Sequence, residues 1–169
     1  TLNPRTATVT HEGGHAKDGP AYSQKKQVSF ITFCCVLLPR TVIEQVGYLD
    51  ESLFMYCEDV DYCIRLTNAG VPLWYIPLAK LWHRAGGTAG GMLSVYYITR
   101  NTLYLRCRGR SKAYRWALGC KELFLGGVSC TMAALLGHHY GRSYGRWRGA
   151  VDFMKGETGK KPPQGKSPL

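Results

Sequence analysis

The sequence predicts an α/β fold in which short strands and helices are followed by a helical, basic segment. Three observations support this prediction. Residues 28–38, VSFITFCCVLL, are almost continuously apolar and rich in β-branched and aromatic side chains, which is typical of a buried strand. From Glu58 onward apolar residues recur at spacings of three and four, which is the period of a helix. Residues 94–108 repeat the helical period with many arginines, and residues 117–137 are the most apolar long segment.

Turn and breaker residues place the other elements. Residues 1–27 are polar, with glycine and lysine pairs, so we expect a loop there. Residues 40–46, RTVIEQV, indicate a short helix. Residues 72–77 and 78–83 are then expected to form two short strands, and the glycine-rich residues 84–91 a loop.

Glycines mark the expected ends of the first two helices. Gly47 would end the helix of residues 40–46, and Gly70 would end the helix that begins at Glu58. The longer of these helices has one stripe that we expect to be buried. The stripe consists of Val60, Cys63, Ile64 and Thr67.

The net charge of +11 is unevenly distributed along the 169 residues. Residues 1–99 hold eight basic and eight acidic side chains, whereas residues 100–169 hold fourteen basic and three acidic ones. A one-sided basic segment points to an anionic partner, either nucleic acid or an anionic membrane surface. A solvated cationic face without a partner explains the same composition.

The apolar segment at residues 117–137 raises the question of a membrane span. Lys121 and Glu122 interrupt it and leave fifteen uncharged residues, Leu123 to Gly137. Spanning a bilayer takes about twenty residues. We therefore expect a helix that lies in a membrane interface or packs on another helix.

The seven cysteines show neither a Cys-x-x-Cys pair nor the spacing of a zinc site. Several lie in apolar runs, where a free cysteine behaves as a small hydrophobic residue. The pattern indicates a reducing, cytosolic compartment.

Three carboxylates crowd into the run FMYCEDVDY of residues 54–62. Acids in a first helical turn stabilise the helix by about 0.3–1 kcal/mol each, which accounts for one or two of them. Asp61 also has Arg65 four residues later as an ion-pair partner. The apolar residues on both sides would place Glu58 and Asp59 at the rim of a cleft, where a carboxylate of raised pKa works as a general base. A metal pair is the third interpretation.

Twelve residues follow one another in a pattern of a Gly-x-x-Asp-Glu turn, an aromatic pair, Glu-Asp-x-Asp, an arginine, a glycine, a proline and a histidine. They are Gly47, Asp50, Glu51, Phe54, Tyr56, Glu58, Asp59, Asp61, Arg65, Gly70, Pro77 and His83. This pattern resembles glycosyltransferase family 2, most of all the rhamnosyltransferase-like enzymes of bacterial surface-polysaccharide synthesis. The run YYITRN at residues 96–101 also matches. The likeness is strong over residues 28–105 and weaker to about residue 160.

The resemblance implies a GT-A fold, a Rossmann-like α/β sheet that binds a nucleotide-sugar and a divalent metal, Mn²⁺ or Mg²⁺. Asp59 would be the base that deprotonates the acceptor hydroxyl, with Glu58 beside it as a second catalytic residue. Tyr56 and Phe54 would form the wall of the substrate cleft. The reaction would invert the anomeric centre by direct displacement.

Four further site residues follow from the same resemblance. His83 would be a metal ligand or a contact of the diphosphate. Arg84 and the glycine loop of residues 86–91 would lie near that diphosphate. Arg100 and Asn101 would bind substrate, by positioning the acceptor or the loop around it.

The resemblance also divides the chain. Residues 1–105 would be the acceptor-side, C-terminal half of a GT-A domain, residues 106–155 a basic amphipathic helical region, and residues 156–169 a disordered tail. The family's Asp-x-Asp motif for the metal, which belongs to the nucleotide-binding half, has no counterpart before residue 28. We therefore expect a fragment that does not bind a nucleotide-sugar normally by itself, with most metal ligands in the other half.

The expected partners are a nucleotide-sugar donor, a glycan or lipid-linked acceptor, and the anionic inner face of the plasma membrane, to which the protein would bind peripherally from the cytoplasm. The alternative is a non-catalytic module that binds membrane or nucleic acid. Tyrosine and tryptophan interleaved with arginine in residues 110–119 and 138–149 would suit nucleic acid. The apolar helix between these basic runs favours a membrane surface instead.

Overall fold

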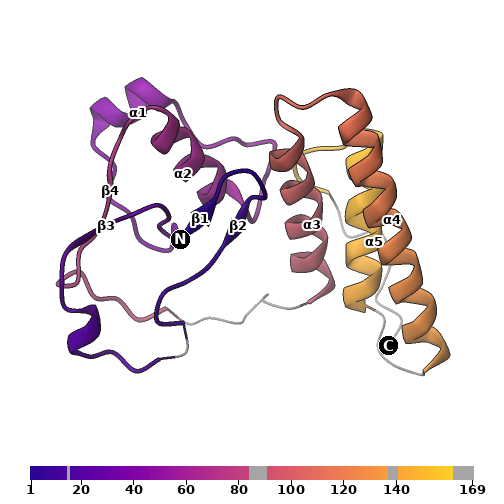
Figure 1. Ribbon diagram of the computed structural model, residues 1–169, viewed down its shortest axis with the longest axis horizontal. Helices are drawn as coiled ribbons and strands as arrows, with labels where there is room; N and C mark the ends of the chain where they lie inside the picture. The colour runs from indigo at the N-terminus through magenta and orange to yellow at the C-terminus, as the bar shows by residue number, and fades with distance from the viewer. Residues whose placement is uncertain (15, 84–90, 137–140, 162–169) are drawn as a thin grey trace. The chain divides into compact units, whose positions relative to one another are not determined.

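The computed structural model describes residues 1–14, 16–83, 91–136 and 141–161 (Figure 1). The chain divides into two compact units. The first unit comprises Thr1–Asp50 and Glu58–Arg84, and the second comprises Glu51–Cys57 and Ala85–Leu169. The first unit mixes strands and helices, which confirms the α/β class, and the helices of the second unit confirm the helical basic segment.

The strands of the first unit are short and antiparallel. β1 (Leu2–Asn3) pairs with β2 (Thr8–Val9), and β3 (Lys26–Val28) pairs with β4 (Leu73–Tyr75). A Rossmann-like sheet has parallel strands with helical crossovers. Among the described residues the two sheets have two strands each, so the Rossmann-like sheet is not confirmed.

The prediction of a buried strand over residues 28–38 is wrong. Only Val28 belongs to a strand, and the residues after it follow an irregular path, with Leu37 94% exposed. Pro72 and Pro77 bracket β4, so the ladder stops after three residue pairs and the apolar run has no strand to continue on. The second predicted strand, residues 78–83, is also irregular.

The predicted helices of the first unit are confirmed. α1 (Arg40–Val46) ends at Gly47, whose φ of 85° lies in the left-handed region that favours glycine. α2 (Glu58–Asn68) is followed by Gly70, with a φ of 72°. The buried face of α2 differs from the predicted stripe, because Ile64 is only half-buried and Thr67 is exposed.

The core of the first unit forms where α2 meets β4 and the irregular apolar run. The buried members are Tyr62, Cys63, Leu66 and Leu73, and Phe30, Ile31 and Phe33 are among the side chains packed against them. The Cys63 thiol donates a hydrogen bond to the carbonyl of Ile31, and burial raises its pKa to about 11. The thiol is therefore a neutral core group, and all seven cysteines are free.

The second unit is a layer of three helices, α3 (Met92–Cys107), α4 (Lys112–Leu135) and α5 (Gly141–Lys155). α5 packs against both α3 and α4, and those two touch each other little (Figure 1). Glycines allow this close approach: a Cβ at Gly126 would lie 2.9 Å from the Cα of Trp147, and one at Gly149 would lie 2.6 Å from the carbonyl oxygen of Tyr96. The buried members of the core are Leu103, Cys107, Leu118, Ala150 and Phe153.

α4 is longer than the fifteen uncharged residues counted in the sequence, because it begins at Lys112. Its 24 residues are long enough and apolar enough to cross a membrane, by length and composition alone. Glu122, one of the two charged residues that interrupt its apolar sequence, is paired with a basic residue of α5. Arg146 Nη2 lies 2.7 Å from the Glu122 carboxylate. α4 packs on α5, which agrees with the prediction that this helix either packs on another helix or lies in a membrane interface.

The chain after α5 is partly described. Its first six residues, 156–161, contact α3 and the turn before α2: Gly159 N–H donates to the carbonyl of Ser52 at 2.6 Å, and Lys161 N–H to the hydroxyl of Tyr97 at 3.1 Å. Gly159 and Lys161 therefore have defined partners, whereas residues 162–169 of the predicted disordered tail lie outside the described part.

Candidate functional site

The acid cluster lies in the first turn of α2, as predicted from its spacing. Asp61 is completely buried and accepts a 2.9 Å hydrogen bond from Nε of Arg65. Arg65 also donates to the carbonyls of Val46 and Tyr48, so it ties α2 to the end of α1. The structural role predicted for Asp61 is therefore confirmed, and two carboxylates remain for chemistry.

Asp59 is half-buried, and this burial raises the pKa of its carboxyl group above the ordinary value. The backbone N–H groups of Val60 and Phe33 oppose the change, and so does the nearby ring of His11. The N–H of Val60 donates to Oδ1 at 2.8 Å. Burial outweighs these contacts, so Asp59 holds its proton to higher pH than a solvated aspartate, which is a property of a general base.

Glu58 is the second half-buried carboxylate of the helix start. Its pKa is raised by burial and, less strongly, by the charge of Asp59. Its Oε2 atom is buried and has no hydrogen-bond partner among the described residues. A buried acceptor without a donor is costly, by about 1–3 kcal/mol, so this atom is suited to a ligand hydroxyl or to its own proton.

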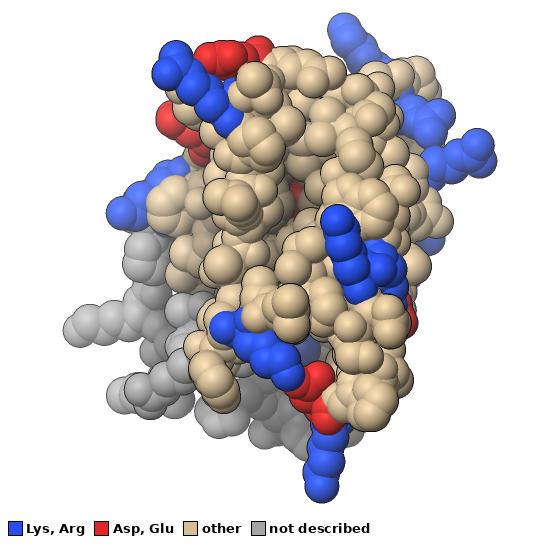
Figure 2. All heavy atoms as spheres, turned by 90° about the vertical axis from the view of Figure 1, so that its left-hand side faces the viewer, with Lys and Arg blue, Asp and Glu red and all other residues tan. Residues whose placement is uncertain are grey.

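His11 is a site residue that the sequence reasoning missed, since residues 1–27 were predicted only to be a loop. Its ring lies edge-on to Phe30, with 5.6 Å between the ring centroids, and its proximity lowers the pKa of the Asp59 carboxyl group. No fixed spacing in the sequence connects His11 to Asp59, because the two come near each other only through packing of the N-terminal loop. On the surface of the first unit, seen in Figure 2, lysine and arginine stand mostly at the edges of a largely uncharged centre.

The turn before α2 has a strained backbone. Phe54, Tyr56 and Cys57 have φ values of 60°, 64° and 68°, in the left-handed region that bulky residues avoid. Such residues cost on the order of 1–3 kcal/mol each and persist only where the surroundings enforce them. The turn belongs to the second unit, so its support comes from α3.

Asn101 supplies most of that support. Its side-chain Nδ2 lies within hydrogen-bonding distance of three carbonyl oxygens of the turn, those of Leu53, Met55 and Tyr56, at 2.9, 2.9 and 2.8 Å. The amide has two N–H groups, so one of them is shared between two of these oxygens. Nε of Arg100 donates to its Oδ1 at 3.0 Å, which fixes the orientation of the amide. Asn101 is completely buried.

Arg100 is completely buried as well and holds two segments together. Its Nη1 donates to the carbonyl of Gly159 at 2.8 Å, and its Nη2 to the carbonyl of Leu53 at 3.1 Å. The guanidinium also lies over the ring of Tyr97, 4.9 Å from its centroid. Both side chains bind the backbone of the turn and are completely buried, which agrees with the predicted role of positioning a loop, and a direct contact with the acceptor stays a prediction.

The aromatic residues of the turn have more open side chains. Tyr56 is half-buried and Phe54 is 43% exposed. Phe54 packs on Tyr97 with 5.4 Å between ring centroids, and the amine of Lys160 lies 5.5 Å from its ring. Both remain available for the contact predicted for them.

The predicted diphosphate and metal residues are the least defined part of the site. His83 is exposed, Arg84 lies outside the described residues, and so does the glycine loop except Gly91. Among the described residues no three His, Cys, Asp or Glu side chains are close enough together to hold a metal ion. These residues therefore do not fit a divalent-metal site by themselves.

Comparison with known proteins finds relatives that match part of the chain. The chain is 36% identical over 93 residues to N-acetylglucosaminyl-diphospho-decaprenol L-rhamnosyltransferase of Mycobacterium tuberculosis. The match covers 46% of this chain and 30% of that enzyme. The chain is also 49% identical over 41 residues to rhamnosyltransferase WbbL of Escherichia coli, covering 24% of this chain and 16% of WbbL.

A third relative is the low-salt glycan biosynthesis hexosyltransferase Agl10 of Haloferax volcanii, 48% identical over 37 residues, or 22% of this chain and 12% of Agl10. No family model and no solved structure matches the chain. The resemblance to rhamnosyltransferases that the motif order predicts is thus confirmed over part of the chain.

Proposed function

We propose that this chain is the acceptor-side part of an inverting glycosyltransferase of family 2 that transfers a sugar from a nucleotide-sugar in cell-surface polysaccharide synthesis. The observation that supports it most is the pair Glu58 and Asp59, both half-buried with raised pKa values, in a motif order typical of rhamnosyltransferase-like enzymes. The Rossmann-like GT-A sheet is part of this proposal for the complete domain.

In the proposed reaction Asp59 acts as the general base. Its carboxylate removes the proton from the acceptor hydroxyl while the hydroxyl oxygen forms a bond to the anomeric carbon of the donor sugar. The bond from that carbon to the diphosphate oxygen breaks on the opposite side, and the electron pair leaves with the nucleoside diphosphate. Attack from the opposite side inverts the anomeric centre. A raised pKa brings the base closer to the operating pH, which improves its efficiency.

Glu58 and Tyr56 have supporting roles in this proposal. Glu58 has a buried oxygen that can accept a hydrogen bond from an acceptor hydroxyl. Tyr56 lies in the turn that Asn101 holds in place, and its half-buried ring would contact the sugar. His83 and Arg84 remain proposed contacts of the diphosphate or of a divalent metal whose other ligands lie elsewhere in the enzyme, and no step above depends on them.

The proposed acceptor is a glycan or a lipid-linked glycan, and the proposed location is the cytoplasmic side of a membrane. The mycobacterial relative is named for a diphospho-decaprenol acceptor. The exposed side of α4 supports the location, because it presents Phe124, Val128 and Leu135 to the surroundings and has basic residues before it. Flotation with anionic liposomes, against salt-dependent binding to an oligonucleotide, separates this proposal from nucleic-acid binding.

The substitution Asp59→Asn tests the proposed base, in an enzyme that contains this chain. We expect transfer of a labelled sugar to fall by at least about 10²-fold, the contribution of a general base, with donor binding measured by calorimetry little changed. The matched control is Asp18→Asn, which alters an exposed carboxylate of the same unit. Full transfer by the Asp59 variant would mean that another group is the base.

The donor side needs a separate test, since the match spans 30% of the mycobacterial enzyme. We propose that this chain alone binds UDP- or dTDP-sugars weakly even with Mn²⁺. Calorimetric titration of the isolated chain measures this directly. Micromolar affinity would contradict the assignment of donor binding to another part of the enzyme.

A further inference from the structure

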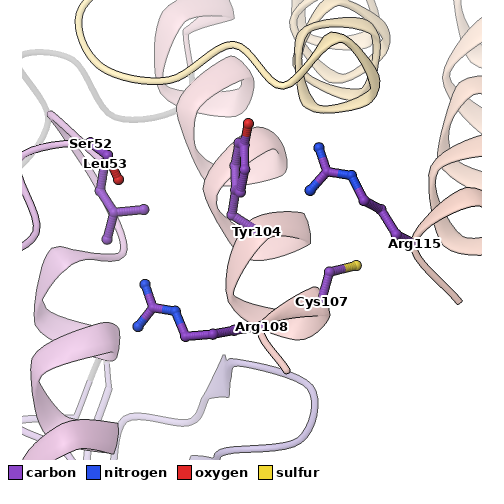
Figure 3. A pocket seen from close by; sticks show the side chains of 6 residues that line it. All are labelled: Ser52, Leu53, Tyr104, Cys107, Arg108 and Arg115. Atoms are coloured by element: carbon purple, nitrogen blue, oxygen red, sulfur yellow. The ribbon is translucent and has the colours of Figure 1, made fainter. Parts of the chain in front are cut away.

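The segment that follows α5, residues 156–161, runs back along α3 within the second unit (Figure 1). Two tyrosines of α3 hold it. The hydroxyl of Tyr104 donates to the carbonyl of Glu157 at 3.4 Å, and in Figure 3 this hydroxyl points toward the chain that leaves α5. The hydroxyl of Tyr97 accepts from the N–H of Lys161 at 3.1 Å. The segment is therefore fixed to α3 near both of its ends.

Gly159 lies between these two contacts and is bonded through both of its backbone polar groups. Its N–H donates to the carbonyl of Ser52 at 2.6 Å, and its carbonyl accepts from Nη1 of Arg100 at 2.8 Å. Arg100 in turn donates through Nη2 to the carbonyl of Leu53 at 3.1 Å. Gly159, the buried guanidinium and the start of the turn before α2 therefore form one closed set of hydrogen bonds.

The backbone of Gly159 has a conformation that favours glycine. Its φ of 71° lies in the left-handed region. A side chain would find open space there, since nothing lies within 4 Å of a Cβ built at this position. The requirement for glycine is therefore conformational and not steric. Asparagine tolerates the left-handed region, whereas a β-branched residue does not.

The turn that Gly159 contacts needs support from its surroundings. Phe54 and Tyr56 have left-handed φ angles of 60° and 64°, which persist only where other contacts enforce them. Asn101 of α3 supplies hydrogen bonds to the later part of this turn. The segment after α5 binds the earlier part at Ser52, and the amine of Lys160 lies 5.5 Å from the ring of Phe54. The segment thus contacts both the backbone of the turn and one of its aromatic rings.

We propose that residues 156–161 are a brace that positions the aromatic turn for substrate, with Gly159 as the positioning residue. Resting on the proposed function, the brace acts through Tyr56, whose ring would contact the acceptor sugar. It takes no part in proton transfer to Asp59. If the turn had its binding conformation for only about a tenth of the time, the apparent affinity for that sugar would fall about tenfold.

Hydrogen exchange of the full 169-residue chain tests the brace itself. In Gly159→Val the Met55 amide, which donates to the carbonyl of Leu53 within the turn, should exchange at least about tenfold faster. Gly159→Asn keeps the left-handed conformation and should change this exchange less than about twofold. The matched control is Gly70→Val, because Gly70 has a φ of 72° and equally open surroundings but belongs to the first unit. It should leave the Met55 amide unchanged.

A second variant keeps the test valid if Gly159→Val does not fold, which circular dichroism reports. Tyr97→Phe removes the hydroxyl that accepts from the N–H of Lys161 and leaves the backbone of the brace unaltered. Exchange of the Met55 amide should then be about fivefold faster, as expected for the loss of one hydrogen bond.

Kinetics of an enzyme that contains this chain test the effect on substrate. Gly159→Val should raise the KM for the acceptor about tenfold and change kcat less than about twofold, because uniform binding is lost while the base is unaltered. The pH dependence of kcat should also stay the same. Gly159→Asn should restore the KM of the unaltered enzyme.

An unchanged Met55 amide in Gly159→Val, or an equal acceleration in Gly70→Val, would overturn the brace. Exchange in Gly159→Asn as fast as in Gly159→Val would also overturn it, since the left-handed conformation would then not be what holds the segment. Faster exchange with an unchanged KM would reject the role in substrate binding. The exchange measurement involves no sugar transfer, so it confirms or refutes the brace independently of the role proposed for Asp59.

Discussion

The hydrogen bonds of Asn101 predict a large effect for a single amide. In the substitution Asn101→Ala, three carbonyl oxygens of the turn lose a donor. The carbonyl of Leu53 keeps a 3.1 Å bond from Arg100, so two carbonyls, those of Met55 and Tyr56, lose the donor that holds them. Each buried hydrogen bond contributes about 1 kcal/mol, and an unsatisfied partner costs about 1–3 kcal/mol.

These contributions give an expected loss of about 2–4 kcal/mol in the free energy of unfolding. The strain of the turn supports the upper part of the range, since left-handed φ angles at Phe54 and Tyr56 need enforcement by their surroundings. The same substitution should release the turn locally before the unit unfolds. Opening made easier by 2 kcal/mol corresponds to about 30-fold faster amide exchange.

Two measurements check this prediction. Urea unfolding gives the loss of stability, and hydrogen exchange reports the amide of Met55, which donates to the carbonyl of Leu53 within the turn at 2.7 Å. The control is Asn68→Ala at the exposed end of α2, which should change stability by less than about 0.5 kcal/mol. If both variants lose the same small amount, Asn101 does not hold the turn and the reasoning from its three contacts is refuted.

Three further substitutions test other parts of the structure. Glu58→Gln should stabilise the fold at pH 7 and have little effect near pH 4. The pKa of the Glu58 carboxyl is raised on folding, so this group contributes stability below its unfolded pKa and loses that contribution as the pH rises through its folded pKa. Glutamine is neutral at both pH values and so avoids the loss. Unfolding as a function of pH checks this, and an effect of the same size at pH 4 and pH 7 would contradict it. Gly149→Ala should destabilise by about 1–3 kcal/mol because the new Cβ meets the carbonyl oxygen of Tyr96 at 2.6 Å, whereas Gly127→Ala, with 4.0 Å to its nearest neighbour, should be neutral or stabilising in thermal melts. Tyr96→Phe should cost about 1–3 kcal/mol, since the Tyr96 hydroxyl donates to the buried Asp152 at 2.8 Å; a loss no larger than that of the exposed Tyr114→Phe would contradict it.

The sequence predicted the helices better than the strands, for a physical reason. A helix closes its hydrogen bonds within one segment, so the spacing of apolar residues and an end glycine such as Gly47 suffice to place it. A strand needs a partner that lies elsewhere in the chain. The run at residues 28–38 had the composition of a strand, but β4 offers only three residues to pair with, and the run packs on α2 as irregular chain instead.

The same contrast applies to the candidate site. Asp61 with Arg65 could be read from a spacing of four, because the pair lies on one helix face. The position of His11 near Asp59 has no such local signal in the sequence. The run containing Arg100 and Asn101 could be found from the sequence, but only the structure shows that both side chains are buried and hold the backbone of the turn.

The residues from Phe54 to Asp59 gather costs that a merely structural helix start would avoid. Acids that only complement a helix dipole keep their water, and their pKa values then fall below the ordinary range. Here burial raises the pKa of both Glu58 and Asp59, and the chain immediately before them is held in three left-handed conformations. Local conflict that other contacts must offset is typical of functional sites. The helix-start interpretation explains Asp61 fully, but it does not explain why the other two acids are desolvated, and a general base does.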